Sequence, residues 1–210
     1  MVFIVYHQIN ELLFKMILWE IEQLAFCKKL TTKFFSERLE RISRYFDMLC
    51  SSFRIMKDGM DLDQYMKFRK TLAPASGFQS AQYRMIEFAS TDLINLIDYR
   101  FRKTINRNTP FQHAFEHLYW QAAGKNHETG EKSPMIRLFE EKYLDDFIGF
   151  MKKYNNKNLW CLYENLPEKE KSDLELLNSM RHFDHTVNVK WVMEHYNTCL
   201  LYTSPSPRDH

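Results

Sequence analysis

The sequence predicts an all-α fold, and three observations support that prediction. Apolar residues recur at helical spacing, as Phe3, His7, Phe14 and Leu18 do on one side of the first segment. Helix start and stop residues divide the chain into segments of helical length. No convincing run of strands and no internal repeat interrupts this pattern.

The first half of the chain predicts four helices. A turn at Lys57-Asp-Gly59 separates the second helix from the third. The segment from Leu72 to Phe78 cannot be helical, because Pro74 lacks an N–H group and Gly77 favours other backbone angles. The predicted helices cover residues 1–26, 32–53, 62–72 and 78–101.

Proline and polar residues mark the helices of the second half. Thr109-Pro110 begins a helix with proline at its first position, and Pro134 opens another that reaches about Tyr154. The residues between Gly124 and Ser133 form a polar loop. After Pro167, the stretch from Ser172 to Glu175 has the pattern of a capping box at the start of the last helix, which runs to about residue 197.

Residues 1–198 are predicted to form a single helical domain. The chain begins inside an amphipathic pattern with no cap residue ahead of it, so we expect residues to be missing before Met1. From Cys199 the composition changes abruptly to Ser, Pro and Thr. The end of the chain resembles translated sequencing-adapter sequence, and residues 199–210 are therefore treated as a non-native tail.

Composition and charge exclude several classes of protein. A net charge of +2 gives no reason to expect binding to nucleic acid or to an anionic membrane. The four cysteines are scattered without a CxxC or CxxCH motif, which excludes a Cys-rich zinc site and covalent haem attachment. The apolar N-terminus carries charges and lacks a basic region, so neither a signal peptide nor a membrane span is predicted, and a cytoplasmic location with reduced thiols is expected.

Two of the predicted helices carry candidate binding residues. Tyr65 and Arg69 are four residues apart and share a helix face, where the Arg guanidinium could hold a carboxylate with help from the Tyr hydroxyl. Phe3 and His7 have the same spacing on the first helix. A surface Arg beside a packed Tyr, and a histidine within the core, are the structural alternatives.

Two stretches carry a family resemblance: FIVYHQINELLFK (3–15) and YMKFRKTLAPASGFQSAQYRMIEF (65–88). Together they resemble the tryptophan 2,3-dioxygenase family of cytosolic, all-helical, homotetrameric haem enzymes. The pattern F-R-x-x-L-x-x-A-S-G-F-Q-S-x-Q-Y-R is long and specific. The resemblance covers about residues 1–198 and is weaker over 100–165.

The resemblance implies a role for each matching residue. His7 is implied to lie beside the indole N–H, and Phe3 to form an aromatic wall. Arg69, assisted by Tyr65, is implied to hold the carboxylate of L-tryptophan. Ser76 and Gly77 match backbone that passes over the haem, where a side chain at position 77 would intrude. Arg84 is expected to support this turn rather than to touch substrate.

The resemblance also implies a non-covalent haem b, bound through a histidine on a late helix. His185 has Val189 and Val192 on its side of the helix, and it aligns best with the family's ligand. His182, with Asn178 and Thr186 as neighbours, is the second candidate.

The implied reaction cleaves the indole C2–C3 bond of L-tryptophan with O2 and gives N-formylkynurenine. The family's N-terminal segment, and the Gly- and Thr-rich loop after the proximal helix, have no counterpart in this sequence. The resemblance therefore leaves open whether this chain is active and whether it forms the homotetramer.

Two other functions are compatible with parts of the sequence. A non-catalytic module that binds haem or tryptophan on the same fold could retain the same residues. The stretch from His113 to His117 matches HxxEH, in which two histidines bind zinc and the glutamate acts as base in a metallopeptidase.

Overall fold

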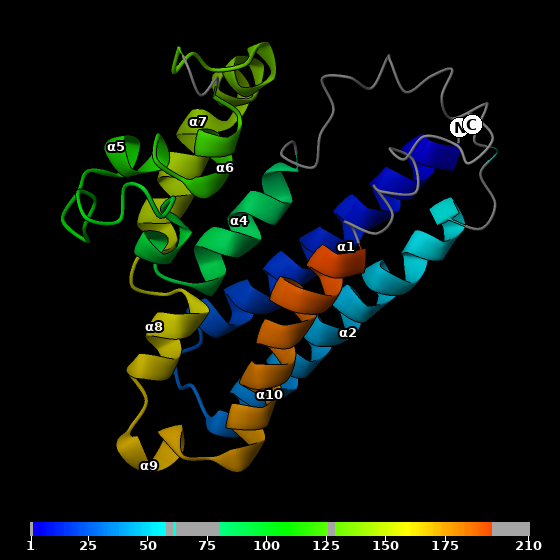
Figure 1. Cartoon of the computed structure of the whole chain (residues 1–210). Helices are drawn as coiled ribbons and strands as arrows, with labels where there is room; N and C mark the ends of the chain where they lie inside the picture. Colours follow the sequence, from blue (N-terminus) through cyan, green and yellow to red (C-terminus); the bar gives the residue numbers. More distant parts are fainter. Residues whose placement is uncertain (1, 58–60, 62–79, 126–128, 195–210) are drawn as a thin grey trace. The chain divides into compact units, whose positions relative to one another are not determined.

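The computed structural model describes residues 2–57, 61, 80–125 and 129–194 of the chain (Figure 1). Among these residues no β-strand forms, and pairing of extended backbone is limited to the isolated bridges Ile97–Leu118 and Lys125–Lys132. The predicted all-α fold is therefore confirmed. None of the helices that these residues form combines the length and apolar character needed to cross a membrane.

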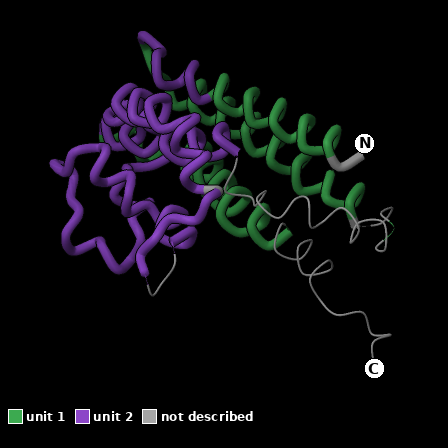
Figure 2. Tube along the Cα trace, turned by 90° about the horizontal axis from the view of Figure 1, so that it is seen from above, with its two compact units in different colours: residues 1–20, 29–71, 168–210 green, residues 21–28, 72–167 purple. Residues whose placement is uncertain are grey.

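The chain divides into two compact units, which Figure 2 distinguishes by colour. Unit 1 comprises residues 1–20, 29–71 and 168–210, and unit 2 comprises residues 21–28 and 72–167. The long first helix, α1 (Val2–Ala25), contributes residues to both units.

Unit 1 is built on three helical segments that lie side by side in Figure 1: α1, α2 (Thr32–Lys57) and α10 (Leu174–His185). The ring of Tyr6 pairs with that of Phe53 and the ring of Phe14 with that of Phe46, so α1 and α2 run antiparallel. A six-residue π-helix, η4 (Thr186–Trp191), continues α10. The first two helices match the predicted segments closely.

The start of α10 differs from the predicted capping box. The N-cap is Asp173, whose side chain accepts a hydrogen bond from the backbone N–H of Leu176 at 3.0 Å. The Ser172 hydroxyl instead donates to the carbonyl of Lys169, at the end of the short helix α9 (Glu168–Lys171). Because the Ser172 hydroxyl is already bonded to α9, the next residue, Asp173, is the N-cap of α10.

Unit 2 contains shorter helices packed around a long one. Its core surrounds Phe147 on α7, whose ring contacts Phe88, Phe115, Trp120 and Phe139. The helices of this unit are α4 (Ala81–Ser90), η3 (Leu93–Leu96), α5 (Phe111–Phe115), α6 (Tyr119–Ala123), α7 (Pro134–Tyr154) and α8 (Leu159–Glu164).

Two predicted elements of unit 2 require correction. The predicted helix over residues 78–101 ends at Ser90, because Thr91 is extended and the Asp92 carboxylate accepts hydrogen bonds from Asn158 and Cys161. Tertiary contacts at Asp92 thus override the helical pattern that follows it. Pro110 is the N-cap of α5 rather than its first helical residue. By contrast, α7 begins at Pro134 as predicted, behind the N-cap Ser133.

Candidate functional site

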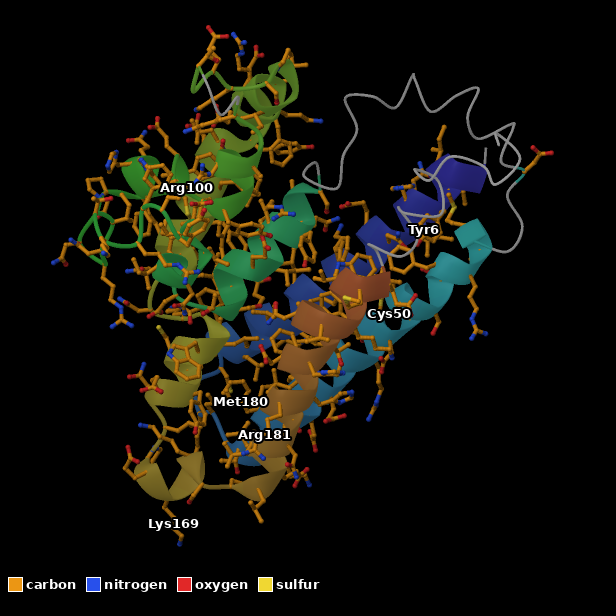
Figure 3. All side chains as sticks on the ribbon, viewed as in Figure 1. Tyr6, Cys50, Arg100, Lys169, Met180 and Arg181 are labelled. Carbon is orange, nitrogen blue, oxygen red and sulfur yellow. The ribbon has the colours of Figure 1, made fainter. Side chains whose placement is uncertain are left out.

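The candidate residue His7 lies on the exposed side of α1, in unit 1. The neighbouring Tyr6, labelled in Figure 3, is buried and packs on Phe53 of α2. The Ser52 hydroxyl donates to the Tyr6 hydroxyl oxygen at 3.3 Å. Tyr6 and His7 meet edge to face, with 5.3 Å between ring centroids. Because Tyr6 fixes this turn of α1 against α2, the backbone that carries His7 is held in place.

The candidate iron ligand His185 is the last residue of α10 and is exposed. Its side chain makes no hydrogen bond or ion pair to another described residue. The π-helix η4 begins at the next residue, and π-helical turns often occur at functional sites because they re-aim side chains. Val189, four residues after His185, is 46% exposed. Because residues 186–191 form a π-helix, with more residues per turn than an α-helix, Val192 does not lie on the side of His185 that α-helical spacing predicts. Among the described residues, the His185 imidazole thus has no polar partner and lies near the exposed Val189.

His182, the second candidate ligand, has a partner. Its Nδ1 atom lies 3.5 Å from Glu40 Oε1 on α2, so the imidazole can form an ion pair when it is protonated. An imidazole used in this way presents one fewer free nitrogen than that of His185. The pairing of His182 with Glu40 thus adds a second difference between the two histidines to the apolar neighbours that the sequence gives His185.

The helix that carries both histidines is anchored in the core of unit 1 through Trp191. The indole lies 5.0 Å from the ring of Phe53, 5.9 Å from that of Phe14 and 6.2 Å from that of Phe46. Lys190 Nζ also lies 2.5 Å from Asp47 Oδ1 on α2. These contacts hold η4 against α1 and α2 and so define the position of His185 relative to the rest of unit 1.

Most of the other predicted site residues lie outside the described residues. This is true of Tyr65, Arg69, Ser76 and Gly77. Phe3 belongs to α1, but its side chain is not among those described. Of the predicted site, the structure therefore brings His7, His182 and His185 into one unit.

The described part of unit 1 fits a bound haem in the character of its donor and its surface. A haem iron needs one imidazole nitrogen, and the porphyrin needs apolar surface beside it. Among the described residues, the His185 imidazole has no polar partner, and the exposed Val189 offers apolar surface four residues further on. Within the described ranges, no group of three or more His, Cys, Asp or Glu side chains could hold a metal ion by itself.

The HxxEH stretch does not have the geometry of a zinc peptidase. That motif requires both histidines on one continuous helix, whereas α5 ends at Phe115, between His113 and His117. His117 Nδ1 lies 2.8 Å from the backbone oxygen of His113, and its ring packs against Phe101 with 4.5 Å between centroids. His113 therefore belongs to α5, and His117 belongs to the turn that follows it.

The sequence did not reveal a polar network around Arg84, the last residue of the pattern F-R-x-x-L-x-x-A-S-G-F-Q-S-x-Q-Y-R. Arg84 is buried and contacts both Glu87 and Tyr119, all within unit 2. The spacing of Arg84 and Glu87 by three residues indicates a possible ion pair on a helix. Nothing in the sequence indicates Tyr119, which is 35 residues away from Arg84.

Comparison with known proteins identifies the family. The sequence model of the family described as tryptophan 2,3-dioxygenase matches residues 1–199 of this chain. A tryptophan 2,3-dioxygenase from Ruegeria sp. (strain TM1040) is 30% identical over 208 residues, which cover 92% of this chain and 72% of that protein.

Two further relatives match a smaller share of their own length. Tryptophan 2,3-dioxygenase B of Danio rerio is 33% identical, over 82% of this chain and 42% of that protein. The tryptophan 2,3-dioxygenase of Geobacillus thermodenitrificans (strain NG80-2) is 41% identical, over 42% of this chain and 32% of that protein. The chain thus spans less than half the length of these two relatives. Because the family model matches nearly the whole sequence, this chain belongs to the tryptophan 2,3-dioxygenase family.

Proposed function

We propose that this chain is part of a haem-dependent dioxygenase that cleaves the indole C2–C3 bond of L-tryptophan with O2. The product is N-formylkynurenine, which contains both oxygen atoms, so no external reductant is consumed in the overall reaction. The observation that carries this proposal is the match of the family model over residues 1–199. The curated relatives have the same activity in their names.

Substrate binding is assigned to residues from two motifs. Arg69 holds the substrate carboxylate through paired hydrogen bonds, and Tyr65 adds a third. Phe3 packs against the indole ring. Ser76 and Gly77 lie on the haem side of the substrate, where the lack of a side chain at position 77 leaves room for it. All of these assignments rest on the motif match in the sequence.

His7 orients the substrate by accepting a hydrogen bond from the indole N–H. An indole N–H is a very weak acid, so a full proton transfer to the imidazole would be unfavourable. The exposed position of His7 on α1 and the fixed turn at Tyr6 support this orienting role.

His185 is the proposed axial ligand of a non-covalent haem b. Support comes from the lack of a polar partner for its imidazole among the described residues, from its position at the start of η4, and from the exposed Val189 four residues further on. Bound haem would supply the iron chemistry that activates dioxygen. The protein contributes the position of the substrate and the exclusion of water.

The remaining assignments concern the protein as a whole. We propose that residues 1–198 form the haem dioxygenase domain, that the full protein is a homotetramer and that it is cytoplasmic. Support for these three statements is the family membership.

Haem titration tests the ligand assignment. Purified wild-type protein and the His185→Ala and His182→Ala variants are each mixed with haem, and ferric and CO-bound ferrous absorption spectra are recorded. We expect the spectrum of a histidine-ligated haem in the wild type and in His182→Ala, and its loss in His185→Ala. Loss in His182→Ala alone would move the ligand by one helical turn. Absence of the spectrum in the wild type would contradict the haem assignment.

Product formation separates the dioxygenase from a binding module on the same fold. The whole protein that carries this chain is incubated with haem, a reductant, O2 and L-tryptophan, and N-formylkynurenine is measured by its absorbance and mass. Haem and tryptophan binding without product would favour the non-catalytic module. An Arg69→Lys variant provides the internal check, because it should weaken tryptophan binding while leaving the haem spectrum unchanged.

A further inference from the structure

The residues that face the core of unit 1 change register where α10 continues into the π-helix η4. Thr186 and Trp191 are both buried although they are five residues apart, a spacing that would place them about 140° apart on an α-helix. Lys190 would share the side of Thr186 on an α-helix, because it is four residues further on, yet its side chain is 45% exposed. The π-helix adds one residue to the turn, and this rotates the side chains that follow by about 100° about the helix axis.

This rotation decides which side chains lie beside His185, the proposed iron ligand. On a continuous α-helix Val192 would share the side of His185, since it is seven residues further on. After a shift of one residue Met193 takes that place, and its side chain is 52% exposed. Val189 is only four residues from His185, so it stays on the same side, where it is also exposed. The apolar side chains beside His185 are therefore Val189 and Met193.

The preceding turn of α10 adds a cation to the same side. Arg181, which Figure 3 labels, is four residues before His185, so the two side chains share a helix face. Arg181 is exposed and makes no ion pair with any residue that the structure describes. The carboxylate nearest to it in sequence, that of Asp184, accepts a hydrogen bond from Asn188 at 2.7 Å. The Arg181 guanidinium is therefore available to an anionic ligand.

The side chains around His185 thus follow a chemical order along the helix, and we call them the exposed strip. A free cation comes first, the imidazole follows, and apolar side chains end the series. An exposed arginine and an exposed valine are common on any solvated helix, so the order is the informative feature. The exposed strip consists of Arg181, His185, Val189 and Met193.

Haem b has the same order of groups across its face. Its two propionate carboxylates lie on one edge, the iron is at the centre, and apolar methyl and vinyl groups occupy the opposite edge. The planar fork of an arginine binds a carboxylate through paired hydrogen bonds. The flexible thioether side chain of methionine adapts its shape to an apolar surface. Charge and polarity of the exposed strip therefore complement a haem in one orientation.

The spacing along the helix fits this arrangement. Arg181 lies about 6 Å before His185 along the axis, and Met193 lies at most about 12 Å after it. The side chains at both ends are long and flexible, so they extend the reach of the strip beyond these axial distances. The central position belongs to His185, which has no polar partner among the described residues.

We propose that the exposed strip orients haem b on unit 1, with Arg181 paired to a propionate and with Val189 and Met193 against the apolar edge. This inference rests on the proposed function, and in particular on His185 as the iron ligand. It assigns the apolar contact to Met193, because the π-helix turns Val192 away from this side.

The propionate contact is tested by comparing haem b with its dimethyl ester, which lacks the two negative charges. The purified whole protein is titrated with each ferric compound and binding is followed by absorption. For the wild type we expect roughly a tenfold preference for haem b, as for a hydrogen-bonded charge pair. Arg181→Gln should lose this preference. Arg54→Gln should keep it, because Arg54 is an exposed cation on α2 in the same unit but not on the strip.

The apolar contact is tested by a pair of variants at adjacent positions. Met193→Gln and Val192→Thr each replace an exposed apolar side chain by a polar one of similar size. Transfer of haem b from each protein to apomyoglobin measures how fast the haem is released. We expect roughly fivefold faster release from Met193→Gln, because apolar contact area is lost, and a rate close to that of the wild type from Val192→Thr. Urea unfolding of the haem-free proteins should give the same stability for both variants.

Each alternative result has a defined meaning. Equal affinity of the wild type for haem b and its ester, or a preference that Arg181→Gln retains, would overturn the propionate contact and with it the orientation. Faster release from Val192→Thr than from Met193→Gln would overturn the register that the π-helix sets. If the wild type does not give the spectrum of a histidine-ligated haem, the proposed haem site fails and the orientation fails with it. A normal spectrum with unchanged preference and release in the variants overturns the orientation alone.

Discussion

Unit 1 buries a carboxylate and leaves its cationic partners near solvent, whereas unit 2 buries a cation. In unit 1, the Glu20 side chain is 2% exposed and pairs with Arg38 and Arg41 of α2 at 2.8 and 2.9 Å. In unit 2, the buried Arg84 pairs with Glu87 and donates a hydrogen bond to Tyr119, which is itself partly exposed to solvent. The Glu20 network joins two long helices that amphipathic packing would already bring together. The Arg84 network joins two short helices that depend on such contacts for their position.

This difference indicates two uses of buried charge. Removing the Glu20 network should lower the free energy of unfolding, while α1 and α2 keep their packing against each other. Removing part of the Arg84 network should instead loosen the contact between α4 and α6. The predictions below test this contrast, beginning with the apolar core on which unit 2 depends.

The largest effect is expected from Phe147→Ala in unit 2. Phe147 is fully buried among Phe88, Phe115 and Phe139. The cavity and the lost burial should lower the free energy of unfolding by about 3–5 kcal/mol. Urea unfolding followed by circular dichroism measures the change. Leu138→Ala on the same helix is the control, since Leu138 is exposed and should cost less than about 0.5 kcal/mol. Similar losses in both variants would mean that this core does not hold unit 2 together.

A smaller loss is expected from Glu20→Gln in unit 1. The neutral amide leaves the half-buried Arg38 without its countercharge, which should cost about 2 kcal/mol. The matched control is Glu37→Gln, because Glu37 and Lys33 form an exposed pair at 4.0 Å on the same helix, worth less than about 0.5 kcal/mol. Thermal and urea unfolding should show this order. The relative order of hydrogen exchange rates along α1 and α2 should stay the same. A change confined to one helical turn would mean that the Glu20 network positions that turn, which would contradict the contrast with unit 2.

The buried thiol of Cys50 predicts how stability depends on pH in unit 1. Burial raises the pKa of Cys50 from 9.0 to about 11. In the unfolded chain the thiol ionises first, so the unfolded state binds fewer protons above pH 9. The contribution of the neutral thiol is therefore complete below pH 9 and is lost as pH rises toward about 11. Unfolding free energies measured from pH 8 to 11 should fall less steeply for Cys50→Ala than for the wild type.

The sequence predicted unit 1 better than unit 2, for a physical reason. In α1 and α2 the apolar spacing continues over 24 and 26 residues, so the local pattern and the packing agree. In unit 2 the pattern after Ser90 is helical, but Asp92 makes its hydrogen bonds with Asn158 and Cys161, more than sixty residues away. Contacts at that distance leave no trace in local periodicity.

The candidate site shows the same limit. His7 and His185 could be selected because motifs and helical spacing single them out. The pairing of His182 with Glu40 could not be predicted, because the sequence does not place Glu40 near either histidine. Tyr119 was missed altogether, because a tyrosine on a five-residue helix carries no local signal of its bond to Arg84.

The smallest effect concerns two thiols, one in each unit, whose pKa values are raised for different reasons. Burial raises the pKa of both Cys50 and Cys161 to about 11, but at Cys161 the Asp92 carboxylate adds to the effect by accepting the thiol hydrogen bond at 3.1 Å. Asp92→Asn removes that negative charge. Arg107, which pairs with Asp92, lowers the pKa of the thiol, but its effect is smaller than that of Asp92. The pKa of Cys161 should therefore fall while that of Cys50 stays the same. Alkylation rates from pH 8 to 11, resolved by peptide mass spectrometry, measure both thiols in one sample. A parallel shift at Cys50 would show that the substitution loosened the whole chain, and no shift at Cys161 would mean that burial alone determines its pKa.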